Sequence, residues 1–316
     1  MSIFALRSNG LASSAYKNLS STQSSLNANI GRLSSGLRIN STADDSAGSN
    51  ISVRMSNQVR GMSQANRNAQ DANNLLATAE SGLSDISDIV SKMRELAVQA
   101  STDTLNDNDR SSIDLEFQSL KNELSRIANV TEYNGMNVLN GTYQEDGTGE
   151  AAPESLATSQ NNGSYNQDQP GVYPGASDQA NDSRGHWRIQ IGADNDVNNQ
   201  HEFSIMNADA NGLNLDDDLV VTVDDARDAI TALDDAIDEL NRERSYVGSE
   251  QNKLQFTMSN LTSNIQSIES ARSSIEDVDF AAEAADLAKN QILAQSGTAM
   301  LAQASAISQN ILGLLA

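Results

Sequence analysis

The chain has 316 residues, of which 43 are acidic and 20 basic, so its formal net charge is −23. This balance argues against nucleic-acid binding, which needs a basic surface, and a hydrophobic content of 38% excludes a bilayer-spanning protein. The absence of cysteine excludes disulfides and thiolate metal sites. Only 12 residues are aromatic, so we expect a thin, rod-like core rather than a large globular one.

The charges are distributed very unevenly. All 43 acidic residues lie between Asp44 and Asp286, whereas residues 1–43 carry four basic side chains and residues 290–316 carry no charge. We therefore expect the two ends of the chain to be buried together and the middle to face water. The N-terminal segment lacks the apolar run of a secretory signal, so any export would use another route.

Three helical patterns occupy the N-terminal half. A mostly apolar stripe over 11–37 recurs in steps of four, four and three, an eleven-residue repeat that predicts a nearly straight or slightly right-handed helix pair. Residues 51–100 show unbroken steps of four and three, and 6 of the 15 positions are alanine, which permits close helix packing. A shorter pattern over 113–127 follows a polar break. The N-cap candidates in that break are Asn106, Asp107 and Asp109.

Between the helical blocks the sequence contains a low-complexity segment and short β signals. All three prolines fall within residues 144–184, which are rich in Gly, Ser, Asn, Gln and Asp and predict a surface insertion. The β signals predict hairpins at one end of the rod. They are the turn pairs Asn134-Gly135 and Asn140-Gly141 and the alternating residues Trp187-Ile189-Ile191, Phe203-Ile205 and Leu219-Val221-Val223.

The strongest periodicity lies in the C-terminal half. Over residues 226–275 the steps alternate four and three without a break, and at 1.5 Å per residue this predicts a helix about 75 Å long. A last helix over 293–314 has an apolar face wide enough for more than one packing partner. A membrane-surface helix is the alternative for this segment, but its polar face lacks the usual Lys and Arg.

These patterns predict a mainly α fold: an elongated antiparallel coiled-coil bundle with paired N- and C-terminal helices and a small β-hairpin insertion. We expect three parts in this arrangement. They are a terminal helical hairpin (1–43 plus 276–316), a coiled-coil rod with β-hairpins (44–143 plus 185–275) and the variable surface insertion (144–184).

No catalytic, cofactor or metal site emerges from the motifs. His201-Glu202 could open a zinc protease motif, but Ile205 stands where the second histidine is required. Asp194, Asp196 and Asn198 have the spacing of a calcium loop, but the turn glycine and the closing glutamate are absent. We interpret these residues and the Asp pairs nearby as solvated loops and helix ends. The sequence thus predicts no cofactor and no enzyme activity.

Apolar ends on a charged rod predict a subunit that is fully buried only in an assembly, and repetition of one contact gives an open helical filament. At this point the sequence closely resembles bacterial flagellin. The matching stretches are LNANIGRLSSGLRINSTADDSAG (26–48), KMRELAVQA (92–100), TEYNGMNVLNG (131–141), ARSSIEDVDFAAE (271–283) and QILAQSGTAMLAQASAISQNIL (291–312).

The resemblance implies a secreted subunit that polymerises into the flagellar filament for motility. It also implies export through the flagellar type III apparatus with an export chaperone, addition under a cap, and attachment to hook-junction proteins. The terminal hairpin would form the inner tube and the rod the outer tube. The expected polymerisation core is Leu19, Leu26, Ile30, Leu33, Leu37, Met300, Ile307, Ile311 and Leu314.

In the family, the segment that matches 92–100 is recognised by an innate immune receptor and also packs between subunits. The bundle stripe passes through Met93 and Ala97, so Lys92, Leu96 and Gln99 are expected to face away from it, and Glu116 takes the matching position on the next helix. Contacts within the filament alone are the alternative role of these four residues. Lys92 replaces the arginine of well-recognised members, which changes the hydrogen-bond geometry.

Two other functions are kept as alternatives. A hook-filament junction or tip protein of the same appendage would share the terminal helices but would not polymerise into long fibres. An enzyme grafted into 144–221 would show peptide hydrolysis that a chelator abolishes. In addition, the net charge of −23 predicts that salt favours polymerisation.

Overall fold

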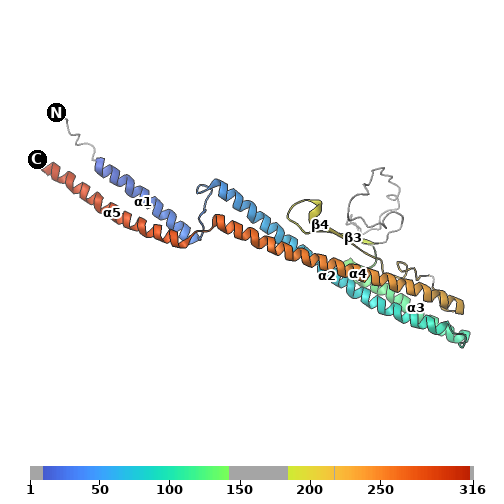
Figure 1. Ribbon diagram of the computed structural model, residues 1–316. Helices are drawn as coiled ribbons and strands as arrows, with labels where there is room; N and C mark the ends of the chain where they lie inside the picture. Colours follow the sequence, from blue (N-terminus) through green and yellow to red (C-terminus); the bar gives the residue numbers. More distant parts are fainter. Residues whose placement is uncertain (1–9, 142–183, 217, 314–316) are drawn as a thin grey trace, which may run out of the picture. The chain divides into compact units, whose positions relative to one another are not determined.

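The computed structural model describes residues 10–141, 184–216 and 218–313 (Figure 1). Nearly all of the expected insertion over 144–184, and Leu314 of the expected polymerisation core, lie outside the described residues. The main helices are α1 (Gly10–Ser35), α2 (Ser46–Ala100), α3 (Asp107–Val130), α4 (Val223–Glu276) and α5 (Phe280–Gly313). The strands are β1 (Glu132–Tyr133), β2 (Met136–Asn137), β3 (Gly185–Gln190) and β4 (Gln200–Ile205), with a 3-10 turn η2 (Val197–Asn199) before β4. The predicted mainly α architecture with small β-hairpins is confirmed.

Side-chain caps define where four of these helices begin. Asn106 caps α3 by accepting a 2.9 Å hydrogen bond from the Asp109 N–H, which selects among the three candidates. Asp45 accepts from the N–H groups of Ala47 and Gly48 at the start of α2. The Thr222 hydroxyl and the Asp225 carboxylate exchange bonds with each other's N–H at the start of α4, and Asp279 caps α5 in the same way as Asp45 caps α2.

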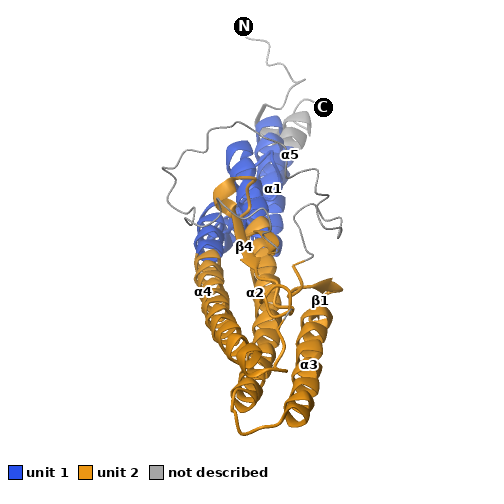
Figure 2. Ribbon diagram, turned by 90° about the vertical axis from the view of Figure 1, so that its right-hand side faces the viewer, with its two compact units in different colours: residues 1–60, 264–316 blue, residues 61–263 orange. Residues whose placement is uncertain are grey.

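Residues 61–263 form one compact unit (Figure 2). Its core is formed by α2, α3 and α4. On α2, every position of the predicted stripe from Met62 to Ala100 is buried. Contacts between Arg94 and Asp234, Glu80 and Arg244, and Asn66 and Thr262 place α2 and α4 antiparallel. The largest fully buried side chains include Phe117, Leu76, Leu83, Ile86, Met93, Leu233 and Leu240.

Two antiparallel hairpins pack on this unit. β1 and β2 are joined by Asn134 and Gly135, which both have positive φ (53° and 76°), as the predicted Asn-Gly turn requires. In the β3–β4 hairpin, Trp187, Phe203 and Ile205 point inward and are buried. The Asn68 side chain donates to the Gln190 carbonyl, and Glu243 accepts from the Met206 N–H.

These contacts correct two expectations. Residues 68 and 243 lie well inside α2 and α4, so the β3–β4 hairpin lies along the helices and not at one end of the rod, because its apolar face is buried on their flank. The strand expected over 219–223 is also absent: Leu219 and Val221 are exposed, and Val223 already begins α4.

The second compact unit comprises residues 1–60 and 264–316, of which 10–60 and 264–313 are described. It contains α1, α5, the N-terminal part of α2 and the C-terminal part of α4 (Figure 2). Its boundaries fall inside α2, after residue 60, and inside α4, before residue 264, so it takes in more of both long helices than the expected part formed by residues 1–43 and 276–316. None of the described helices is long and apolar enough to cross a membrane.

Candidate assembly surface

In the pair formed by α1 and α5, a glycine of α5 faces a leucine of α1. A Cβ placed on Gly297 would lie 3.3 Å from the Leu19 Cδ1 atom, so the glycine lets α5 approach α1 at this level. Arg32 adds two long ion pairs, at 3.8 Å to Glu283 and 3.9 Å to Asp44. Both are partly exposed and contribute little to stability.

Large apolar side chains remain exposed on this pair. Their exposed fractions are Tyr16 67%, Ile30 48%, Phe280 58%, Ile292 64%, Leu293 47% and Met300 65%. Of the expected polymerisation core, Leu19, Leu26, Leu33 and Leu37 are half-buried. Ile307 and Ile311 lie in α5, but their side chains are outside the description. Exposed apolar area of this extent marks an interaction surface, and no charged residue follows Lys289 to oppose its burial.

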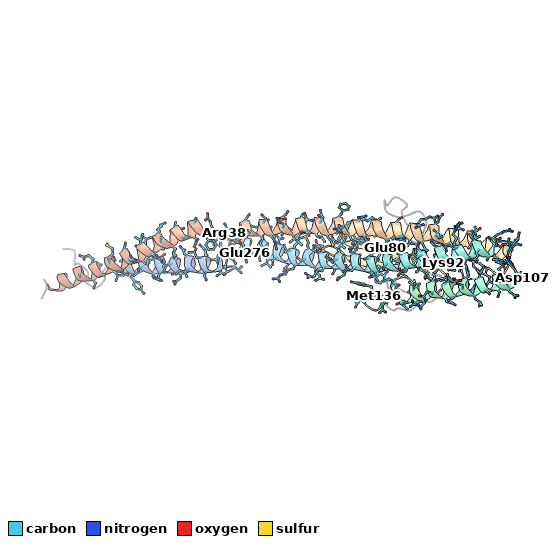
Figure 3. The ribbon with its side chains drawn as sticks, turned by 90° about the horizontal axis from the view of Figure 1, so that it is seen from below. Arg38, Glu80, Lys92, Asp107, Met136 and Glu276 are labelled. Atoms are coloured by element: carbon cyan, nitrogen blue, oxygen red, sulfur yellow. The ribbon has the colours of Figure 1, made fainter. Side chains whose placement is uncertain are left out.

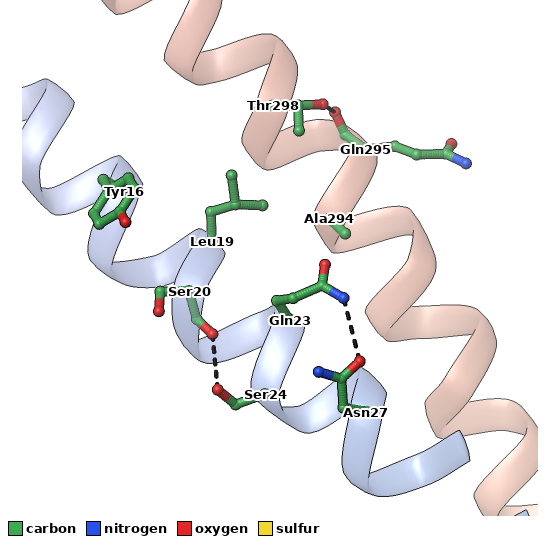
Figure 4. A pocket seen from close by; sticks show the side chains of 9 residues that line it. All are labelled: Tyr16, Leu19, Ser20, Gln23, Ser24, Asn27, Ala294, Gln295 and Thr298. Atoms are coloured by element: carbon green, nitrogen blue, oxygen red, sulfur yellow. Dashed lines mark hydrogen bonds between the residues drawn. The ribbon is translucent and has the colours of Figure 1, made fainter. Parts of the chain in front are cut away.

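A groove runs between the two helices of the pair (Figure 4). It has a volume of about 550 Å³, and α1 supplies most of its lining while α5 supplies Ala294, Gln295 and Thr298. Gln23 donates to Asn27 along the α1 edge, and Ser24 donates to the Ser20 carbonyl. The lining contains no ionisable group apart from the Tyr16 hydroxyl, so it fits an uncharged partner surface.

The two chain segments that connect α1 to α2 and α4 to α5 are bonded to each other. The Arg38 N–H donates to the Glu276 carbonyl at 2.6 Å, the Val278 N–H donates to the Gly36 carbonyl at 3.0 Å, and the Arg38 guanidinium donates to the Ile275 carbonyl. Gly36 has φ of +76°, which favours glycine. Arg38 and Glu276 thus meet in one connection (Figure 3).

Short polar side chains close the connection around this crossing. The Ser52 hydroxyl donates to Glu276 at 2.6 Å. The Asp44 carboxylate accepts from the N–H groups of Asn40 and Ser41 and from the Ser41 hydroxyl, and these hydrogen bonds, chiefly those from Ser41, lower the pKa of Asp44. A Cβ on Gly48 would lie 2.7 Å from the Ile39 Cδ1 atom. The stretches 26–48 and 271–283 therefore build one connection, a role that their periodicity did not reveal.

The four residues expected at the receptor surface are not equivalent. Lys92 (labelled in Figure 3), Gln99 and Glu116 are exposed. Lys92 pairs with Glu95 at 2.7 Å. The hydrogen bond and charge of Glu95 raise the pKa of Lys92, and Glu116 on α3 adds a smaller contribution in the same direction. Leu96 is only 5% exposed and belongs to the core, so the expectation that it faces away from the bundle is wrong.

Sequence reasoning missed two buried cations that tie loops to helices. Arg110 is 4% exposed and donates to the carbonyls of Ala100, Thr102 and Leu105, which holds the turn between α2 and α3. Lys121 is 8% exposed and donates to the Asp216 carbonyl at 2.6 Å. The only signal available was a basic residue at helical spacing from the apolar stripe of α3.

Ionisable groups also meet where the β3–β4 hairpin contacts α4. Glu243 is 4% exposed and pairs with Arg184 at 3.2 Å, and burial raises its pKa. His201 Nε2 lies 2.9 Å from a carboxylate oxygen of Glu250. Among the described residues no three His, Cys, Asp or Glu side chains are placed to hold a metal ion. In the loop before β4, the Asp196 carboxylate accepts from Asn198 instead.

Comparison with known proteins gives one consistent result. Residues 6–144 match the family model of the bacterial flagellin N-terminal helical region, and residues 230–315 match that of the C-terminal helical region. The chain is 36% identical over 305 residues to a flagellar filament 33 kDa core protein of Treponema phagedenis, covering 95% of this chain and 96% of that protein. It is 36% identical over 300 residues to a flagellin of Bacillus subtilis, covering 94% and 95%.

A solved structure shares the fold at lower identity. The structure of a putative flagellar hook-associated protein from Vibrio parahaemolyticus is 16% identical, with a TM-score of 0.52, and the match covers 74% of this chain and 100% of that one. At this identity the similarity concerns the fold alone.

Proposed function

This chain belongs to the bacterial flagellin family, and on that premise we propose which of its surfaces join the subunits of a filament. It is a structural subunit of the extracellular flagellar filament and not an enzyme. Polymerisation is driven, in our proposal, by the α1–α5 pair, with residues 1–43 and 276–316 forming the inner tube and the rod around α2, α3 and α4 forming the outer tube. Residues 144–184 then provide the outer surface of the filament.

One observation carries this proposal: α5 presents Ile292, Leu293 and Met300 to solvent in a stretch that has no charge after Lys289. Burial of apolar area contributes roughly 25 cal/mol per Å², so side chains left exposed in one subunit stabilise the contact with the next. The groove between α1 and α5 lacks charged groups and fits such a surface. Ile30 on α1 extends the same apolar area.

The test is seeded elongation of the full chain, compared with a variant in which Met300 and Leu293 are both changed to Gln. These side chains are exposed in the single subunit, so the variant should fold like the unmodified chain but elongate poorly. The matched control is Val197→Gln, because Val197 is 82% exposed but lies in the hairpin loop. Equal elongation by all three chains would show that α5 is not part of the polymerisation surface.

The remaining partners belong to this proposal as well. They are the filament cap, the hook-junction proteins, the export chaperone and the type III export apparatus. An innate immune receptor would meet Lys92, Gln99 and Glu116, which are exposed, whereas Leu96 would contribute only through the packing of α2. A junction or tip protein, the alternative function, is not favoured, because the full-length relatives above are filament core proteins and flagellins.

A further inference from the structure

Positive charge is concentrated on the first part of α2. The first 70 residues carry seven basic and two acidic side chains, although the whole chain has a net charge of −23. Over residues 46–70 of α2 there are three arginines and no acidic residue. They are Arg54, Arg60 and Arg67, and all three are exposed. This segment is therefore locally basic within a strongly acidic chain.

No carboxylate within the described residues pairs with these arginines. Arg54 and Arg60 make no hydrogen bond or ion pair with a described residue, and Arg67 donates only to the neighbouring Gln64 amide. The bond between Asn66 and Thr262 shows that α4 is the adjacent helix at this level. It supplies no carboxylate here, because α4 has no ionisable side chain between Lys253 and Glu269. The three guanidinium groups are thus available to another molecule.

The complementary charge lies at the other end of α4. Residues 223–243 contain eight acidic and two basic side chains. Asp224 and Asp234 pair with Arg227 and Arg94 of their own subunit. Asp228 and Asp235, in contrast, are exposed and make no hydrogen bond or ion pair with a described residue.

Two of these arginines and two of the aspartates also match in spacing. Arg60 and Arg67 are seven residues apart on α2, and Asp228 and Asp235 are seven residues apart on α4. Seven residues are close to two turns, so each pair lies on one face of its helix with a separation of about 10.5 Å. Two helices laid side by side could therefore form both Arg–Asp contacts at once.

We propose that the Arg60–Arg67 face of one subunit docks on the Asp228–Asp235 face of a second copy of this chain. The inference rests on the proposed function, since it assigns one contact between subunits of the outer tube. Charge complementarity selects the partner: no carboxylate in the described part of the same chain pairs with the basic face, and every further copy carries an acidic face of the same spacing. Such contacts set orientation and register as well as affinity.

Charge reversal tests the contact directly. R60E/R67E and D228R/D235R should each raise the critical concentration for seeded elongation about tenfold, because two attractions become repulsions. The chain that carries all four changes should return to the unmodified value. The two double variants shift the net charge of −23 by four units in opposite directions. A general effect of net charge would therefore make D228R/D235R elongate more readily, which is opposite to our expectation.

The matched control is R126E/R188E, which makes the same change in net charge at two exposed arginines that pair with Glu123 and Glu202 of their own subunit. It should elongate nearly as well as the unmodified chain. Circular dichroism of each monomer checks that the helices are retained. Unchanged elongation by R60E/R67E, or no recovery in the fourfold variant, would overturn the inference while leaving the proposed function intact. Failure of the unmodified chain to elongate seeds would overturn both.

Discussion

At the scale of single residues, buried charges hold the loops of this subunit to its helices. Arg110 satisfies three backbone carbonyls at the α2–α3 turn, which helix ends otherwise leave without donors. We expect Arg110→Met to lower the free energy of unfolding by about 3 kcal/mol, because the buried Ala100 carbonyl and two partly buried carbonyls lose their donor. Urea unfolding followed through Trp187, the single tryptophan, measures the change.

Arg126→Met is the control for this substitution. Arg126 lies on the same helix but is 57% exposed and pairs with Glu123 within α3. An exposed pair of this kind contributes less than about 1 kcal/mol. If both substitutions destabilised the chain equally, the carbonyl contacts of Arg110 would not be what stabilises the turn.

Glu243 predicts a pH dependence. Burial raises its pKa in the folded chain, so the folded state binds this proton more tightly than the unfolded state does. Its contribution to stability is complete below the pKa of the unfolded state and is lost as the pH rises through the higher folded pKa. We expect the free energy of unfolding of the Glu243→Gln variant not to show this decrease as the pH rises.

The measurement is a series of urea unfolding curves between about pH 4 and about pH 7 for both chains. The difference between them isolates Glu243 from the many other carboxylates of the protein. Arg184 pairs with Glu243, so the substitution also changes stability at a fixed pH, but the slope with pH is the quantity that matters. Parallel curves would show that Glu243 does not titrate differently in the two states.

The sequence pattern predicted the main buried stripe of α2 but not the burial of Leu96 beside it. The stripe through Met93 and Ala97 was confirmed, but α2 belongs to a unit with both α3 and α4, so its buried face is wider than one seam. A second row seven residues apart marks this extra width. It consists of Leu75, Gly82, Ile89 and Leu96, none of which is exposed. Arg110 and Lys121 were not predictable, because their partners are backbone carbonyls whose positions only the fold determines.

At the scale of elements, helix periodicity was the most informative signal. Every position of the predicted stripe on α4 is buried or half-buried, because a stripe of that length can be covered only by long neighbouring helices. No strand forms at 219–223, because an alternating pattern over five residues does not ensure a neighbouring strand with which to form backbone hydrogen bonds. Val220 is buried, and its N–H donates to the Asp114 carboxylate in place of a strand.

Gly297 allows a prediction about the α1–α5 pair. A Leu side chain at this position would meet Leu19, since even a Cβ comes within 3.3 Å of it. Overpacking of this kind costs about 1–3 kcal/mol, so we expect Gly297→Leu to raise the critical concentration for polymerisation about tenfold or more. Sedimentation of filaments at a series of subunit concentrations gives this value.

Gly31→Ala is the matched control on the same pair, because nothing lies within 4 Å of a Cβ placed there. Replacing a helical glycine by alanine should stabilise α1 by about 0.5–1 kcal/mol. Normal polymerisation by Gly297→Leu would mean that the approach of α5 to Leu19 is not maintained in the filament.

At the scale of the whole molecule, the net charge of −23 opposes the association of subunits. Salt screens this repulsion within a Debye length of about 10 Å at 0.1 M, and excluded salts such as sulfate also favour burial of apolar area. We expect the critical concentration to fall as ammonium sulfate is added, although screening also weakens individual Arg–Asp contacts. Light scattering of seeded samples follows the trend. A critical concentration that does not change with salt would contradict it.

The most direct test of the central claim is electron microscopy of the full chain after addition of short seeds and an excluded salt, beside a chain that lacks residues 290–316. The deletion removes most of α5, including Leu293 and Met300, but leaves α2, α3 and α4 complete. We predict long, uniform filaments from the full chain and soluble, helical monomers from the shortened one. Filaments of equal length from both chains would contradict the account, because the uncharged tail would then not be needed to join the subunits.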